Sequence, residues 1–387
     1  MEFPAGFNIT GIKGENNNNL ALITALQGMK TAAVFTVNTC PAHPVIYSRE
    51  KIKNDIHKAI LVNKGIANAA TGDEGRKRMM DIVNTVCKGL NISEEEILVA
   101  STGVIGKQLN IPDDEINNLI AAQKNVEPMN FAEAIMTTDT CNKVAWSSYE
   151  EWGKKISVFG IAKGAGMVAP NLATMLAFIM TNVNIEKEAL QIALERAVEV
   201  SFNCLNIDGE TSTNDTVFLS ASGEASNEVI KYEEKGFKTF YEHLQKVCIV
   251  LVEKLAADGE GATKLIKIKI YNAPDKTTAK KAARVIASSP LCKTAFYGSS
   301  PNWGRIVSAL GAAGVELNIS QLNIYVNGVS WIKKGKPHKD SIQQVREVMG
   351  GGKYELAIDL SSGSSEGVSY TCDFSPEYVR INAHYVT

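Results

Sequence analysis

Paired cysteines are missing from this 387-residue chain: its seven cysteines are scattered, form no C-x-x-C pair and are odd in number. A disulfide framework needs pairs and a structural zinc site needs clustered ligands, so this distribution argues against both and indicates a reducing compartment. The most apolar long stretch, Met167 to Met180, is interrupted by Pro170 and Asn171 and is too short to span a bilayer. The first residues lack a basic region followed by an apolar run, which predicts a cytoplasmic protein without a signal peptide.

An excess of charge of one sign is also missing. The 40 basic and 42 acidic side chains give a net charge of −2, whereas binding to a nucleic acid needs a basic excess or a basic stripe. The sequence therefore predicts no nucleic-acid partner. The longest basic cluster, Lys333, Lys334 and Lys336 with Lys339, lies among glycine and proline and is interpreted as an exposed hairpin or loop. Hydrophobic residues make up 45% and charged residues 21%, which is typical of a soluble globular protein with a sizeable core.

Short apolar runs bounded by turn residues alternate with long amphipathic segments along the chain. The short runs predict strands and the amphipathic segments predict helices. Predicted strands are 21–26, 32–38, 59–63, 96–101, 321–326, 354–359 and 368–374. Predicted helices are 73–90, 185–203, 231–257 with a break at Gly236, 276–288 and 303–314. This mixed order predicts an α/β protein of the α+β kind, with helices packed on largely antiparallel sheets.

Residues 157–180 carry the most informative motif, in which a strand-like stretch ends at Lys163 and is followed by a glycine-rich turn. One interpretation is a dinucleotide fingerprint, because Gly164 to Ala169 satisfies G-x-G-x-x-A after a strand. Against it, Pro170 stands where the helix of that motif should run, and no acidic residue about 20 positions on lies in a suitable strand. A second interpretation is a buried apolar segment in which Thr174 has no chemical role.

A third interpretation comes from resemblance. The run from Lys163 to Ala177 resembles the self-cleavage signature of the ornithine acetyltransferase (glutamate N-acetyltransferase) family, whose chain breaks before the threonine of Ala-Thr-Met-Leu. Further blocks that resemble the family follow in order from end to end: Asn8–Lys13, Phe35–Asn38, Ser101–Gly106, Thr137–Asp139, Asp208–Asp215, Asp258–Lys264, Pro301–Ile306 and Asn382–Thr387. This breadth makes coincidence a poor explanation and favours the third interpretation.

The resemblance implies cleavage between Ala173 and Thr174 into fragments 1–173 and 174–387, which stay intertwined as one functional unit. It also implies a layered α/β sandwich that resembles N-terminal-nucleophile hydrolases but is differently connected. Cleavage frees the α-amino group of Thr174, whose ordinary pKa of ~7.7–8 lets it accept the proton of the threonine hydroxyl and activate that hydroxyl as nucleophile. This fits a chain with only five histidines, none of them in the signature.

By the same resemblance, Thr102 and Gly103 form the oxyanion hole, where each donor can stabilise the tetrahedral intermediate by about 3–4 kcal/mol. The implied substrates are N2-acetyl-L-ornithine as acetyl donor and L-glutamate as acceptor, and both carry an α-carboxylate. Lys163 matches the family position that binds the carboxylate, and Glu260 matches an acidic position that can pair with an ammonium group. The other implied substrate contacts are Thr137, Thr174, Asn382 and Thr387.

The implied reaction is ping-pong, with an acetyl ester on Thr174 as the intermediate. It needs no metal or redox cofactor, while acetyl-CoA stays open as a co-substrate. The resemblance implies a heterotetramer of two α and two β chains, and no membrane partner is expected. Two rival classes stay open: an amidohydrolase or aminopeptidase with the same N-terminal-nucleophile chemistry, and a dinucleotide-binding oxidoreductase.

Three places depart from the family pattern. Lys64 and Ile66 stand in a run that usually reads Ser-Gly-Asn-Ala-Asn, Ser300 replaces the acid before Pro301, and Ala70 stands where cysteine is common. None of these positions is the nucleophile or a named substrate contact. They therefore bear on fine substrate preference more than on the class of reaction.

Overall fold

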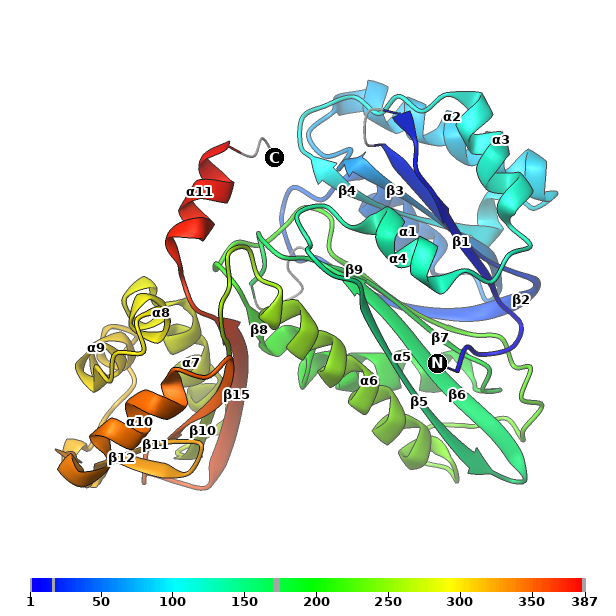
Figure 1. The fold of residues 1–387 in the computed structure, drawn as a ribbon. Coiled ribbons are helices and arrows are strands. Elements are labelled where there is room, and N and C mark those ends of the chain that lie inside the picture. Colours follow the sequence, from blue (N-terminus) through cyan, green and yellow to red (C-terminus); the bar gives the residue numbers. More distant parts are fainter. Residues whose placement is uncertain (1, 16–17, 170–174, 385–387) are drawn as a thin grey trace.

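The computed structural model describes residues 2–15, 18–169 and 175–384, which form two lobes (Figure 1). Eight described strands form the sheet of the first lobe in the order β4-β3-β2-β9-β7-β6-β5, and β1 pairs with β2 at its side. The second lobe contains seven described strands in the order β13-β12-β11-β14-β10-β15-β8. Antiparallel neighbours predominate, as the sequence predicts, and the parallel pairs are β3–β4, β7–β9, β10–β14 and β8–β15.

The elements of the first lobe come mostly from the first two thirds of the chain. Its strands are β1 (Asn8–Ile12), β2 (Asn19–Phe35), β3 (His57–Ile66), β4 (Ile97–Val104), β5 (Lys143–Glu151), β6 (Lys154–Lys163), β7 (Leu176–Thr181) and β9 (Thr216–Ala221). Its helices are α1 (His43–Lys51), α2 (Gly72–Leu90), α3 (Asp113–Ala122), α4 (Pro128–Ile135), α5 (Lys187–Glu199) and α6 (Phe237–Ala257).

The 17-residue strand β2 joins two halves of the first sheet. Its first part pairs with β3 and its last part, from Lys30 onward, pairs with β9, with a register shift after Thr24. The two halves lie on either side of one apolar core, to which each strand contributes alternate residues. This core includes Ile23, Ile60, Val62, Leu98, Phe159, Ile161, Phe178 and Phe218.

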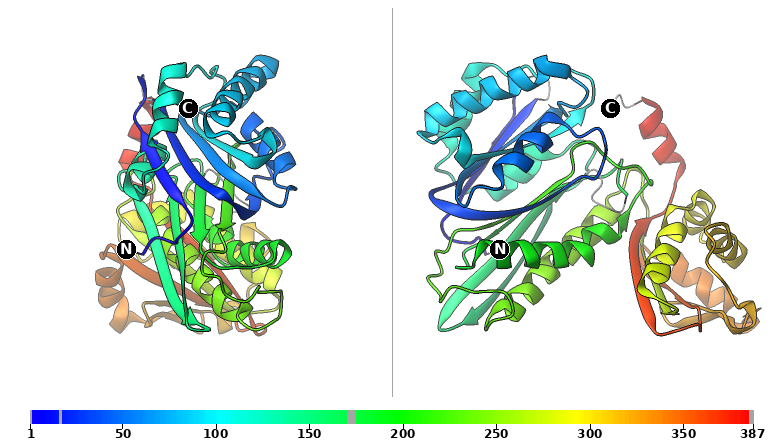
Figure 2. Two further views of the ribbon diagram at one scale, coloured as in Figure 1. Left: turned by 90° about the vertical axis from the view of Figure 1, so that its right-hand side faces the viewer. Right: turned by 180° about the vertical axis from the view of Figure 1, so that it is seen from behind.

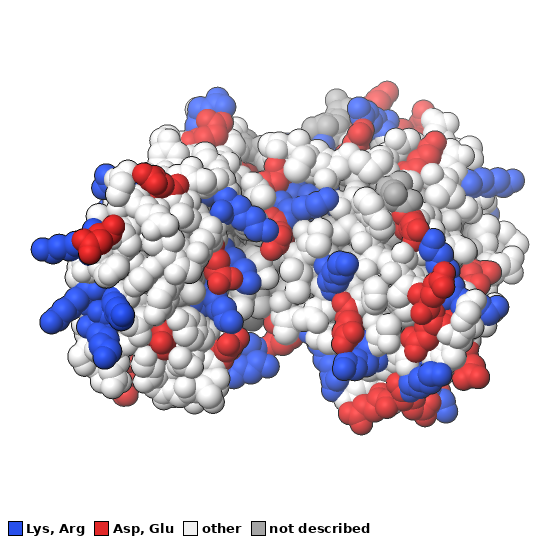
Figure 3. Space-filling model, turned by 60° about the horizontal axis from the view of Figure 1, so that its bottom comes forward, with Lys and Arg blue, Asp and Glu red and all other residues white. Residues whose placement is uncertain are grey.

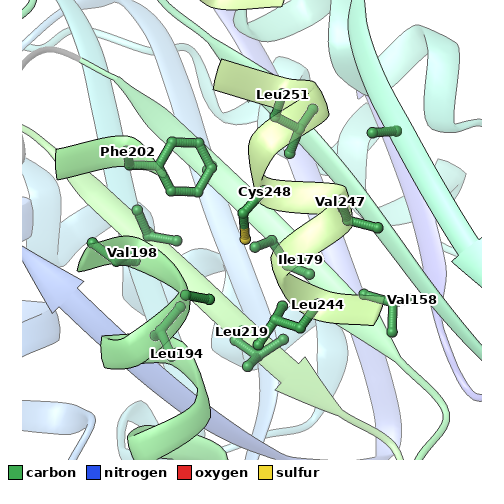
Figure 4. Close-up of a cluster of buried hydrophobic side chains, with 14 of the residues drawn as sticks. Val158, Ile179, Leu194, Val198, Phe202, Leu219, Leu244, Val247, Cys248 and Leu251 are labelled. Atoms are coloured by element: carbon green, nitrogen blue, oxygen red, sulfur yellow. The ribbon is translucent and has the colours of Figure 1, made fainter. Parts of the chain in front are cut away.

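Helices cover both outer faces of this pair of sheet halves. Leu61 of β3 and Val99 of β4 alternate with the central core and pack in a cluster with α2 and α3. On the opposite outer face, Val158 and Ile179 pack against α5 and α6, where Leu251 is fully buried (Figure 4). The first lobe is thus a four-layered arrangement of helices, sheet, sheet and helices, which confirms the predicted mixed α/β class.

The second lobe packs helices on a sheet of its own and lies beside the first lobe, as the right view of Figure 2 shows. Its α7 begins where the Asp275 side chain accepts a hydrogen bond from the Thr278 backbone N–H at 2.8 Å, a helix N-cap. The strands are β8 (Leu205–Asn206), β10 (Leu265–Ala273), β11 (Asn323–Val326), β12 (Val329–Lys333), β13 (Lys336–Pro337), β14 (Lys353–Asp359) and β15 (Ser365–Cys372). The helices are α7 (Lys276–Ser288), α8 (Pro290–Tyr297), α9 (Trp303–Ala312) and α10 (Ile342–Met349).

The last helix, α11 (Pro376–His384), leaves the second lobe after β15 and extends toward the first lobe (Figure 1). None of its residues is buried. Its position matters because two of its side chains, Tyr378 and Asn382, reach the candidate site described below.

The limits of two predicted elements are wrong. The predicted strands 21–26 and 32–38 belong to one strand, β2, which ends at Phe35. The predicted break of helix 231–257 at Gly236 is confirmed, since Gly236 has a left-handed backbone with φ of 89°, but the helix is formed only after that break, from Phe237 onward. A Cβ at Gly236 would overlap the Trp152 ring, so this position also needs glycine for close packing.

The surface carries both signs of charge. On the face shown in Figure 3, basic and acidic side chains are intermixed over both lobes, in keeping with the small net charge. The predicted basic loop around Lys333 is the exposed turn between β12 and β13. Within the described ranges, no helix combines the length and apolar character needed to cross a membrane.

Candidate active site

A cavity of about 460 Å³ brings together the predicted site residues that the structure describes. They come from the end of β4, the loop before β5, the end of β6, the loop after α6 and helix α11. The predicted residues in its wall are Thr102, Gly103, Thr137, Lys163, Glu260 and Asn382. No histidine is found among the described residues that line this cavity. Ala173, Thr174 and Thr387 lie outside the described residues.

Lys163 connects two of these predicted groups at the end of β6. Its side chain is buried, and Nζ donates hydrogen bonds to the hydroxyls of Thr102 at 3.1 Å and Thr137 at 2.8 Å. Burial lowers the pKa of Lys163, while the nearby carboxylate of Asp139 acts in the opposite direction. Because Thr102 accepts the bond from Lys163, its own hydroxyl proton is free to point elsewhere.

A buried chain of ion pairs lies behind Lys163. The Asp139 carboxylate is 4.0 Å from Lys163 Nζ and accepts hydrogen bonds from Lys143 Nζ at 2.6 Å and from the Gly164 backbone N–H at 2.7 Å. Lys143 Nζ also contacts Asp258 at 2.5 Å. Burial alone would raise the pKa of Asp139, but the ammonium groups of Lys163 and Lys143 hold it well below its usual range. This chain fixes the loop before β5 and the end of α6 relative to Lys163.

The proposed oxyanion-hole glycine has a conformation that other residues rarely adopt. Gly103 has φ of +132°, and a Cβ there would overlap the carbonyl carbon of Gly65, its partner on the adjacent parallel strand. Two glycines thus let β3 and β4 approach closely at the cavity wall. The strand context explains how the Thr102–Gly103 pair is held rigidly.

Glu260 sits opposite the glycine-rich turn. Its backbone N–H donates to the Ala165 carbonyl at 2.8 Å, and its carboxylate accepts a hydrogen bond from Asn382 Nδ2 at 2.7 Å. A Cβ at Gly166 would overlap this carboxyl group. Glycine at this position therefore lets the Glu260 carboxyl group approach the turn. The described turn residues 164–169 contain no helix start, so the structure gives the dinucleotide interpretation no support.

No role was predicted for the side chains of loop 207–215, although Asp208–Asp215 was one of the family-like blocks. Asp208 and Asn214 line the cavity, and Asp215 lies in a smaller cavity beside it. Asn214 Nδ2 donates to the carbonyls of Ala67 at 2.7 Å and Ser101 at 2.9 Å, which ties the loop to the strand that carries Thr102. The closely spaced Asp, Asn and Asp were the only sequence signal for this group.

The departures from the family pattern lie at different distances from the cavity. Lys64 is buried in β3 and is the register partner of Thr102, and burial together with Lys163 lowers its pKa. Ile66 follows on the same strand, opposite Val104. Ser300 lies in the second lobe, just before α9, and is not part of the cavity wall. Of these three positions, Lys64 and Ile66 lie on the strand beside Thr102 and Gly103, whereas Ser300 does not border the cavity.

Comparison with known proteins gives matches along the whole chain. A sequence model of the ArgJ family matches residues 5–387. A glutamate N-acetyltransferase of Methanocaldococcus jannaschii is 42% identical, with 99% of this chain and 98% of that protein covered. An arginine biosynthesis bifunctional protein ArgJ of Thermotoga neapolitana is 39% identical over the full length of both. The crystal structure of an arginine biosynthesis bifunctional protein from Bacillus halodurans matches with 37% identity and a TM-score of 0.52, covering 54% of this chain and 98% of that one. The chain belongs to the ArgJ family.

Proposed function

We propose that this enzyme transfers the acetyl group of N2-acetyl-L-ornithine to L-glutamate through an acetyl ester on Thr174. The observation that carries the proposal is the cavity itself, which combines a buried cation, Lys163, with a carboxylate, Glu260, beside the Thr102–Gly103 pair. An amino acid with an α-carboxylate and a distal ammonium group needs this combination of charges. The names of the full-length relatives, glutamate N-acetyltransferase and arginine biosynthesis bifunctional protein, agree with it.

Each wall residue has a task in this reaction. Lys163 and Thr137 bind the carboxylate of the substrate, and Glu260, held by Asn382, pairs with the ammonium group of ornithine. The freed α-amino group of Thr174 accepts the hydroxyl proton as the oxygen attacks the acetyl carbonyl. The Thr102 hydroxyl and the Gly103 N–H stabilise the oxyanion that forms. Ornithine leaves, glutamate enters the same cavity, and N-acetylglutamate is released.

The proposal includes self-cleavage between Ala173 and Thr174. The match to the Bacillus halodurans structure covers 98% of that chain but only 54% of this one, so the solved chain is little more than half as long. The segment from Thr174 to Thr387 is likewise slightly more than half of the 387-residue sequence. A solved chain of this relative length supports a cut at the proposed position.

Further parts of the proposal concern the conditions of the reaction. We propose a cytoplasmic enzyme that works without a metal or redox cofactor and assembles from two α and two β fragments. Thr387 is proposed as an additional substrate contact. Acetyl-CoA is a second candidate donor, and an assay that replaces acetylornithine with acetyl-CoA decides whether the enzyme has one activity or two.

The test compares wild type with a Thr174→Ala variant on a denaturing gel, with Thr277→Ala, an exposed threonine of α7, as the control. Wild type and control are expected to give two fragments in place of the 41.9-kDa chain. The smaller fragment should end at Ala173, and N-terminal sequencing of the larger should begin at Thr174. The Thr174→Ala chain should stay whole and inactive. A wild-type chain that is active while uncut would contradict the N-terminal threonine mechanism.

The same preparations distinguish acetyl transfer from hydrolysis. With acetylornithine as donor, N-acetylglutamate should form faster than free acetate when glutamate is present. Equal acetate release with and without glutamate would instead indicate an amidohydrolase that uses the same nucleophile.

A further inference from the structure

Loop 207–215, between β8 and β9, holds one described end of the segment in which the proposed cleavage occurs. The backbone N–H groups of Ile207 and Asp208 donate to the Val168 carbonyl at 2.8 and 3.2 Å. In return, the Asp208 carboxylate accepts hydrogen bonds from the N–H groups of Met167 at 2.5 Å and Val168 at 2.8 Å. Four hydrogen bonds therefore fix the chain just before the cleavage segment.

The other end of the same loop holds the chain just after that segment. Asp215 Oδ1 accepts a hydrogen bond from the Met175 N–H at 2.8 Å, and the Thr216 N–H donates to the Met175 carbonyl at 3.2 Å. The Met175 nitrogen belongs to the peptide bond with Thr174. The Asp215 carboxyl group is therefore hydrogen-bonded to the residue that directly follows the proposed nucleophile.

The second oxygen of Asp215 is what distinguishes it from an ordinary structural acceptor. Oδ2 is buried and has no hydrogen-bond partner among the described residues. Such an atom is costly unless a partner is supplied, so its presence calls for an explanation. Burial raises the pKa of Asp215 well above its usual range, although the Met175 N–H and Lys163 act in the opposite direction. The neutral acid, which can donate a proton, is the form that burial favours.

Asp215 also shares its surroundings with the proposed oxyanion hole. A small cavity of about 10 Å³ is lined by Asp215, Met175, Thr102 and Lys163 together with Leu176, Ser212 and Asn214. Asp215 thus borders the same space as Thr102, the proposed oxyanion-hole threonine.

We propose that Asp215 is the proton-transfer group of self-cleavage, and that Asp208 is a positioning residue that holds the other end of the cleavage segment. This inference rests on the proposed cleavage before Thr174. It adds to that proposal a side chain that comes from the loop between β8 and β9.

The chemistry of the step balances with a neutral carboxyl group. The Thr174 hydroxyl oxygen forms a bond to the Ala173 carbonyl carbon, and the bond from that carbon to the Thr174 nitrogen breaks. The hydroxyl loses one proton and the leaving nitrogen gains one. Asp215 gives its proton to the nitrogen and takes the hydroxyl proton, so it ends as it began. Water then hydrolyses the ester, which yields the Ala173 carboxyl group and restores the Thr174 hydroxyl.

The experiment follows cleavage of the full-length chain after a short pulse of labelled synthesis, on a denaturing gel. Asp215→Asn keeps the shape and an oxygen that accepts from Met175, but an amide cannot exchange the proton. We expect its cleavage to be slower than wild type by about a hundredfold or more. Asp208→Asn keeps one acceptor oxygen and should be slowed less than tenfold. Asp81→Asn, an exposed aspartate of α2, is the matched control and should cleave as wild type does.

Thermal unfolding of the purified chains shows whether each variant is folded. A folded Asp215→Asn chain that cleaves less than tenfold more slowly than wild type would overturn the role of Asp215. If the wild-type chain stays uncut and gives the same gel pattern as Thr174→Ala, the proposed function fails as well. The gel distinguishes this outcome from the first, in which wild type is cut and Asp215→Asn is cut nearly as fast.

Discussion

At the scale of single residues, the most consequential group is the lysine between two buried carboxylates. Lys143 contacts both Asp139 and Asp258, and its side chain has no exposed surface. Replacing it with methionine removes the only ammonium group that the described residues place against Asp258, and leaves Asp139 with the more distant Lys163, 4.0 Å away. We expect the Lys143→Met variant to lose about 3–5 kcal/mol of unfolding free energy near neutral pH, measured by urea denaturation.

The loss should depend on pH in a defined direction. Because the folded-state pKa of Asp139 is depressed, its stabilising contribution is complete above the unfolded pKa of about 3.9 and disappears as the pH falls through the folded value. Without Lys143 the folded pKa rises, so the deficit should be largest near neutral pH and shrink on acidification. Lys155→Met removes the exposed partner of Glu2 and should cost at most about 1 kcal/mol. A deficit that grows in acid would contradict this account.

The family resemblance predicted several polar residues of the site. It did not predict the buried charged residues whose positions depend on the fold. Lys163, Thr102 and Glu260 were expected at the site, and the cavity contains them. Lys143 had no such signal, and Asp215 stood in a family-like block without an assigned role, because a charged residue in a sequence is normally exposed. The burial of Lys143 accompanies the pairing of β5 with β6, and Asp215 is held by its contact with Met175, neither of which a local pattern reveals.

At the scale of elements, one glycine sets the distance between α6 and the sheet. A Cβ at Gly160 of β6 would lie 2.8 Å from Leu251 Cδ1 and 3.0 Å from Val247 Cγ1. Both contacts come from side chains buried in the α5–α6 layer (Figure 4). Gly160→Ala should therefore force the helix outward and destabilise the fold by about 1–3 kcal/mol in urea denaturation.

The control for this prediction is a glycine with open surroundings. Gly311 lies in α9, and a Cβ there would meet no atom within 4 Å. Gly311→Ala should leave stability unchanged or raise it by up to about 1 kcal/mol, because alanine is the better helix former. If both variants lose the same stability, the close packing of α6 on β6 is not the cause.

Most long elements could be predicted from their patterns, but their limits depend on tertiary contacts. The pattern predicted the helix of α2 to within a residue or so. It divided β2 in two because Gly28 interrupts the apolar run, whereas the strand continues through a register shift there. It also missed β5, in which polar residues such as Ser147 and Glu150 give little apolar signal. Pairing with β6 along its whole length, not propensity, makes this segment a strand.

At the scale of the whole molecule, one sheet contains strands from both sides of position 173/174, with β9 and β7 lying between β2 and β6. β2 pairs with β9 and β6 pairs with β7, so each ladder joins the segment before the proposed cut to the segment after it. After cleavage the fragments should stay together in buffer and elute as one species in gel filtration. They should separate only in concentrated denaturant, and separation in plain buffer would contradict the shared sheet.

The mixed α/β class follows from the strand and helix patterns of the sequence, whereas the order of the strands in the sheet does not. The sheet order β2-β9-β7-β6 brings together segments that are far apart in the sequence, so that Lys30 of β2 lies opposite Ala221 of β9. Side-chain alternation specifies which face of a strand is buried, but it does not specify the partner strand. Resemblance supplied the layered sandwich in advance, and the alternation of buried residues in the central core explains it physically.

The pairing of β6 with β7 across the proposed cut makes folding difficult to repeat once the chain has been cleaved. Before the cut, the loop between these strands keeps them at a high effective concentration, so the sheet assembles as an intramolecular event. After the proposed cut, the same sheet could re-form only by association of two separate polypeptides, at a rate that depends on protein concentration. Refolding of the cut protein should therefore be slower and more dependent on concentration than folding of the uncut chain, so that the unfolding rate would govern how long the cut enzyme stays active.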